Sequence, residues 1–132
     1  METNKSNALQ FYESPKKNII IGEGVGKVTA DDVRWLIEEV KRRGRSIGGK
    51  WAWIAIISRM DPIIDPECQK LFVELHQQLE AEGCVALAYV VGETVTIKVQ
   101  AQRHRVQARD KFVAGYFRTK EEALEWLTGL GF

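Results

Sequence analysis

The sequence has 132 residues, of which 45% are hydrophobic and 28% charged, and its 19 basic and 18 acidic side chains give a formal net charge of +1 at pH 7. This size and this balance are typical of one soluble globular domain, and the chain is too short for two ordinary domains. The near-neutral charge excludes an overall electrostatic attraction to nucleic acid or to an acidic membrane, so such binding would need a local patch.

Targeting and redox features predict a cytoplasmic protein. The longest apolar run, residues 51–57, is much shorter than the ~20 residues that cross a bilayer. The first ten residues, METNKSNALQ, lack the apolar core of a signal peptide. Cys68 and Cys84 do not form a disulfide framework, and we interpret both as reduced core residues. Residues 1–8 are expected to be a flexible N-terminus and residues 9–132 a single domain.

The first predicted elements are a hairpin and a helix. Residues 9–13 and 18–25 are expected strands, and the sequence SPKK between them supplies turn residues. Thr29 has the side chain of an N-cap for the helix that follows. That helix carries an apolar stripe at the helical period, formed by Val33, Leu36, Ile37 and Val40. Gly44, together with Gly48–Gly49, is expected to end it.

Two segments are apolar on both faces, which predicts central strands covered by helices on both sides: residues 51–58 (WAWIAIIS) and 85–91 (VALAYVV). Between them, residues 61–65 are an expected loop. Asp65 is a predicted N-cap of a second helix, and Pro66 occupies its first turn, where the missing N–H costs nothing. Because a helix joins the two strands, we expect a right-handed crossover and a parallel pair.

The C-terminal part contains one ambiguous segment, residues 94–109. Its apolar residues alternate as in a strand over 95–101, whereas a helical face is formed by Val95, Val99, Gln102 and Val106. The β-α-β order favours a helix. Residues 112–117 are expected to be an edge or near-edge strand, and residues 121–130 a final helix capped by Thr119. The predicted fold class is therefore α/β, with a four- to five-stranded mixed sheet, a parallel centre, an N-terminal hairpin and about four helices.

Common catalytic and metal motifs are missing from the sequence. The glycine run 22–27 (GEGVGK) lacks the spacing of a phosphate-binding loop, and Val28 stands where a hydroxyl should follow the lysine. The two histidines show no metal-ligand spacing. His76 is expected at the edge of the second helix's apolar stripe, and the arginines beside His104 should lower its proton affinity. A hydrolase with Cys84 as nucleophile is an alternative that would need a histidine close in space.

The surface offers a few interaction candidates. Trp35 lies off the core stripe of the first helix, so it either packs under the N-terminal hairpin or belongs to a partner surface. The basic runs 41–45 (KRRGR) and 103–105 (RHR) are interpreted as solvated surface; the first lies at a helix C-terminus, where cations are favoured. No aromatic residues flank the second for base stacking. The partner-surface candidates are Trp35, Arg42, Asp61, Asp65, Arg103 and Arg105.

Several segments, taken in order, make the chain similar to the small bacterial STAS-like (SpoIIAA-like) proteins, which are related to anti-sigma-factor antagonists. They are residues 26–33 (GKVTADDV), the two apolar strands and, above all, residues 117–127 (FRTKEEALEWL). The last block resembles the F-x-(S/T/D)-x-x-E-A-x-x-W-L ending common in this group. The resemblance covers about residues 18–130 and supports a helix within 94–109.

The resemblance implies a fold but does not carry the family's switch. In signalling members, the loop after the central strand carries an Asp-Ser pair at a helix start, and phosphorylation of that serine disrupts docking of the anti-sigma partner. Here Asp65 matches the aspartate, but Pro66 replaces the serine and has no hydroxyl. The phosphorylation switch in that form is therefore not expected.

The leading prediction is a non-enzymatic protein-interaction or regulatory module without cofactor or metal. Its partner would be another protein or a second copy of the chain, since homodimers are the commonest symmetric assemblies. Nucleic acid is not an expected partner, and no transmembrane segment is predicted. The alternative is a carrier of a small apolar molecule or lipid, because lipid-transfer domains are a proposed relative of this fold.

Overall fold

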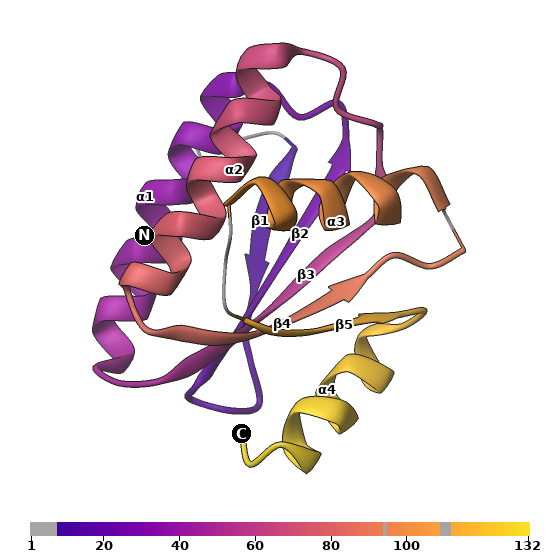
Figure 1. The fold of residues 1–132 in the computed structure, drawn as a ribbon. Coiled ribbons are helices and arrows are strands. Elements are labelled where there is room, and N and C mark those ends of the chain that lie inside the picture. Colours follow the sequence, from indigo (N-terminus) through magenta and orange to yellow (C-terminus); the bar gives the residue numbers. More distant parts are fainter. Residues whose placement is uncertain (1–7, 94, 109–111) are drawn as a thin grey trace.

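The computed structural model describes residues 8–93, 95–108 and 112–132 (Figure 1). Most of the predicted flexible N-terminus, residues 1–7, lies outside the described residues. The elements, in chain order, are β1 (Leu9–Tyr12), β2 (Ile19–Gly26), α1 (Ala30–Ile47), β3 (Trp51–Met60), α2 (Pro66–Ala81), β4 (Cys84–Val90), α3 (Val95–Ala108), β5 (Val113–Phe117) and α4 (Lys120–Gly129).

One five-stranded sheet organises these elements, with the strands in the order β1-β2-β3-β4-β5. β1 is antiparallel to β2, and every other neighbouring pair is parallel. The predicted mixed sheet, its parallel centre and the N-terminal hairpin are therefore confirmed. The two strands predicted to be central, β3 and β4, pair directly and in parallel.

Helices cover both faces of the sheet, which explains why the central strands are apolar on both sides. α1, α2 and α3 lie on one face and α4 lies on the other (Figure 1). Alternate residues of β3 enter the two layers: Trp53 faces the three-helix side, and Ile54 faces α4. On the α4 side the sheet is closed mainly by Ala123 and Leu127, both fully buried.

Side-chain caps fix where the helices begin. At the start of α1 and α4, the side chains of Thr29 and Thr119 each accept a hydrogen bond from the backbone N–H three residues later. The acidic side chain at that later position, Asp32 or Glu122, accepts a hydrogen bond from the backbone N–H of the threonine. These capping boxes satisfy N–H groups that have no partner within the helix. At α2, the Asp65 side chain accepts from the Glu67 N–H, with Pro66 in the first turn, as predicted.

Gly44 does not end α1, contrary to the sequence prediction. The helix continues to Ile47, and the C-cap is Gly48, which the sequence also placed at the helix end, in the left-handed conformation at φ 75°. Gly44 is instead buried inside the helix, where a Cβ atom would lie 2.7 Å from the Trp51 ring. The glycine therefore allows α1 and β3 to approach closely, a tertiary requirement that the local sequence does not reveal.

The segment that fitted both strand and helix is a helix, α3, as favoured. Its predicted buried face was wrong, however. The buried residues are Ile97, Ala101 and His104, whereas Val99 and Val106 are 45% and 76% exposed. The prediction of a helix was therefore correct, but the wrong side of that helix was assigned to the core. The inner side includes a buried histidine, His104, which a search for apolar residues does not select.

Candidate functional site

The loop between β3 and α2, residues 61–65, lies at the carboxyl edge of the parallel strands. In open α/β sheets this edge is the usual place for binding sites. The loop begins at Asp61, whose N–H donates to the Gly26 carbonyl at the end of β2 (2.9 Å). It ends at Asp65, the cap of α2.

Ile63 anchors this loop to two helices. Its N–H donates to Oε1 of Gln100 on α3 (2.7 Å), and Nε2 of the same side chain donates back to the Ile63 carbonyl (2.7 Å). Nε2 of Gln69 on α2 donates to that carbonyl as well (2.8 Å). The Ile63 side chain is only 5% exposed. Because backbone and side chain are both held, the loop has little conformational freedom at this position.

Ile64, the next residue, is 85% exposed. It is the most exposed large hydrophobic side chain among the described residues. Charged groups lie on the neighbouring helices, where Arg34 of α1 bonds both to Asp31 (2.7 Å) and to Glu67 in the first turn of α2. An exposed apolar side chain therefore lies next to an anchored backbone, three residues before the charged side chain of Glu67.

The structure brings only some of the predicted surface residues together. Asp61 and Asp65 share the anchored loop and are exposed. Trp35 is partly buried against the ring of Phe11 in β1, with ring centroids 6.0 Å apart. Trp35 therefore packs against the N-terminal hairpin, which is the first of the two alternatives that the sequence left open.

The predicted arginines lie elsewhere. Arg42 is exposed on α1 and bonds to Glu39, one turn earlier in the same helix. Arg103 is exposed on α3, and the side chain of Arg105 lies outside the described residues. Ile64 was missed by the sequence analysis, although the pair Ile63-Ile64 next to a helix cap was a visible signal.

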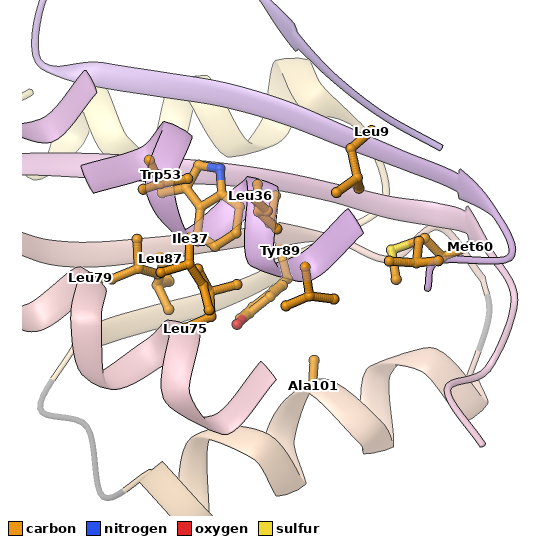
Figure 2. Close-up of a cluster of buried hydrophobic side chains, with 14 of the residues drawn as sticks. Leu9, Leu36, Ile37, Trp53, Met60, Leu75, Leu79, Leu87, Tyr89 and Ala101 are labelled. Atoms are coloured by element: carbon orange, nitrogen blue, oxygen red, sulfur yellow. The ribbon is translucent and has the colours of Figure 1, made fainter. Parts of the chain in front are cut away.

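A cavity of about 50 Å³ lies between the sheet and helices α2 and α3. Figure 2 shows part of its lining, with Met60, Tyr89 and Ala101 around the space. This volume holds one or two water molecules and lies far below the roughly 300–1,000 Å³ of ordinary ligand pockets. The cavity therefore gives no support to the alternative of a lipid carrier.

Beside the cavity lies a buried polar pair, His76 and Tyr89. His76 is 2% exposed, not at the edge of the stripe as expected. Its Nδ1 lies 2.7 Å from the Phe72 carbonyl, and its Nε2 contacts the Tyr89 hydroxyl. Since a carbonyl only accepts, Nδ1 carries a proton, and the second ring nitrogen, Nε2, shares a hydrogen bond with the tyrosine hydroxyl. These bonds satisfy polar atoms inside an apolar layer, which is a structural role.

His104 is also buried, and its ring stacks on that of Phe72 at 5.5 Å. Burial lowers the pKa of His104 to about 4, with smaller electrostatic contributions from His76 and Arg103. The sequence predicted the direction of this shift but assigned it to neighbouring arginines, whereas desolvation is the main cause.

Neither cysteine is accessible to a substrate. Cys68 is fully buried, its Sγ lies 3.5 Å from the Val28 carbonyl, and burial raises the pKa of its thiol to about 11. Cys84 is 2% exposed, and its Sγ lies 3.4 Å from the Ala86 carbonyl. A nucleophilic cysteine must be exposed and ionised. The geometry therefore does not support the Cys84 hydrolase.

Within the described ranges, no group of three or more histidine, cysteine or acidic side chains could hold a metal ion. None of the helices in the described residues has the length and hydropathy of a bilayer-spanning segment.

Solved structures with this arrangement of elements establish the fold. One is the anti-sigma-factor antagonist SpoIIAA in its unphosphorylated form, which matches with a TM-score of 0.62 at 18% identity and covers 92% of this chain and 97% of that chain. The second is an uncharacterized protein of the DUF3478 family from Shewanella loihica PV-4, described as having a SpoIIAA-like fold. It matches with a TM-score of 0.69 at 17% identity, covering 96% and 98% of the two chains. The chain has a SpoIIAA-like fold.

The SpoIIAA-like fold confirms the resemblance seen in the sequence at the level of architecture. No protein-family model matches the sequence, and the comparison with curated proteins gives no significant match. In this SpoIIAA-like chain, the anchored loop occupies the connection from β3 to α2.

Proposed function

We propose that this SpoIIAA-like chain is a non-enzymatic protein-interaction module that docks a partner protein through the loop of residues 61–65. The observation that carries the proposal is the 85% exposure of Ile64 on a backbone held at Ile63. A partner that covers Ile64 would gain most of the ~1.5–3 kcal/mol that burial of such a side chain provides. Because the loop is already ordered, little of this gain is lost to conformational entropy.

The fold supports this class of function. One solved structure with the same fold is an anti-sigma-factor antagonist, that is, a protein that acts on other proteins. Regulation by phosphorylation at the start of α2 is not part of the proposal, since Pro66 has no hydroxyl. A non-enzymatic role is also consistent with the buried thiols of Cys68 and Cys84.

A photo-crosslinking amino acid placed at position 64 tests the proposal in the native lysate. Position 106 provides the matched control, because Val106, like Ile64, is a highly exposed branched aliphatic side chain (76%), but it lies on α3 and not in the loop. We expect a discrete crosslinked protein from position 64 and none, or a different set, from position 106. Equal crosslinking from both positions would show that Ile64 has no special role. A crosslink to a second copy of the chain would identify the partner as the protein itself.

Gln100 provides a second test, because its side chain holds the loop backbone at Ile63 and is separate from the exposed Ile64 side chain that the partner would cover. Gln100→Leu removes both hydrogen bonds to Ile63. We expect the crosslinking yield at position 64 to fall in this variant while the fold, followed by circular dichroism, is retained. An unchanged yield would mean that the ordered loop is not what the partner recognises.

A further inference from the structure

A groove of about 390 Å³ lies between the turn of the β1–β2 hairpin and the C-terminal half of α1. This turn and the end of α1 lie at the amino edge of the parallel strands, opposite the Ile64 loop (Figure 1). Four cationic side chains line the groove: Lys16 and Lys17 from the turn, and Arg42 and Arg43 from the helix.

The two kinds of cation differ in how they are held. Arg42 and Arg43 both bond to Glu39, and the Arg43 guanidinium also lies over the ring of Phe11, 4.2 Å from its centroid. Lys16 and Lys17 are exposed and form no ion pair with any other described residue. The arginines are therefore ordered, while the lysine ammonium groups are available to a ligand.

Charge is concentrated at this groove. Among the described residues, the groove is lined by four cationic side chains and one carboxylate, Glu13; with Glu39, which pairs with both arginines, the balance is two positive charges, more than the +1 of the whole chain. A helix dipole accounts for cations at the end of α1, but it does not account for two lysines in a hairpin turn far away in the sequence. A local basic patch of this kind attracts anionic ligands even on a neutral protein.

We infer that this groove binds an acidic segment of a partner protein. The groove is concave and of ligand-pocket size, as an extended peptide requires, whereas basic residues that bind an anionic bilayer act on its broad, flat surface. Partly buried Ile47 lines the groove and offers an apolar contact between the charges. A segment with two carboxylates flanking an apolar residue would match both the surplus charge and this contact.

A fluorescein-labelled peptide of alternating glutamate and leucine residues, followed by fluorescence anisotropy, tests the inference. Charge reversal is made at the two lysines (Lys16→Glu with Lys17→Glu), because reversal of the arginines would disturb their bonds within α1. The matched control reverses two exposed lysines outside the groove (Lys27→Glu with Lys70→Glu) and so changes the net charge equally. Circular dichroism checks that all variants fold.

We expect the groove variant to bind the peptide at least about tenfold more weakly than the wild type, and the control less than about threefold more weakly, since rim charges act locally and through steering. Equal weakening in both variants would overturn the inference, because net charge alone would explain it. Vesicles containing phosphatidylserine form a second arm. Groove-dependent binding to vesicles without binding to the peptide would also overturn it, in favour of a membrane site. Neither result bears on the Ile64 loop, which lies at the other edge of the sheet.

Discussion

Replacement of Gly44 by alanine should destabilise the protein, although the same change inside a helix normally stabilises it. Alanine is favoured over glycine by ~1 kcal/mol in a helix interior. At Gly44, however, the new methyl group would lie 2.7 and 2.9 Å from two ring atoms of Trp51. Atoms of these types are normally in contact at about 3.5–4.0 Å.

The Trp51 ring has little room to move away. Its side chain is fully buried, and its Nε1 donates to the Glu82 carbonyl (2.9 Å). Overpacking of such a site costs about 1–3 kcal/mol. After subtraction of the ~1 kcal/mol gain in helix propensity, we expect Gly44→Ala to lower the free energy of unfolding by up to about 2 kcal/mol, which corresponds to a fall in Tm of up to about 8 °C.

Urea unfolding, followed by tryptophan fluorescence and circular dichroism, measures this effect as a lower midpoint at an unchanged m-value. Gly129→Ala provides the matched control, because Gly129 ends α4 and nothing lies within 4 Å of its would-be Cβ. That variant should be as stable as the wild type or slightly more stable. The reasoning about the contact with Trp51 would be refuted if Gly44→Ala were as stable as Gly129→Ala.

Three further predictions concern buried polar groups. The pKa of His104 is about 4 in the folded protein, whereas its ordinary value is 6.5. Between these pH values the unfolded chain binds more protons than the folded protein, so the free energy of unfolding should fall as the pH drops from about 6.5 to 4. The full effect is about 3 kcal/mol, and urea titrations across this range should show a smaller loss for His104→Gln. Tyr89→Phe removes a hydroxyl that bonds to buried His76 and should lower the free energy of unfolding by about 1–3 kcal/mol. Tyr116→Phe removes a buried hydroxyl without a partner in the described residues, so it should change the stability little or raise it. Equal losses of stability in the two variants would contradict this assignment. Cys68 should resist iodoacetamide until the protein unfolds, because its thiol is buried and its pKa is about 11. Mass spectrometry measures the labelling, and modification of Cys68 in the folded protein would show that the packing around it opens.

The sequence predicted the features that depend on neighbouring residues. Segments 51–58 and 85–91 are apolar throughout, and Thr29, Asp65 and Thr119 have cap side chains; the strands and helix starts therefore followed from local chemistry. The observed strands differ from the predicted ones only by shifts of one or two residues at their ends.

The sequence could not predict features that arise when distant segments meet. Gly44 looked like a helix end until Trp51 was placed against it. In α3, His104 counts as polar, so the sequence pattern selected the exposed valines as the inner face. The basic groove likewise joins Lys16 and Lys17 to Arg42 and Arg43, which lie more than twenty residues later in the sequence. The adjacent pair Ile63-Ile64 does not reveal which side chain is buried until the bonds from Gln100 are seen.

The position of α4, alone on its face of the sheet, has a consequence for the synthesis of the protein. This helix is the last of the domain's elements to leave the ribosome, and until it docks, one side of β2, β3 and β4 presents a continuous apolar surface to water. The nascent chain must therefore complete its fold after residue 129 has emerged. In the interval, this uncovered face is the part of the chain most prone to aggregation and most open to chaperones that bind apolar surface.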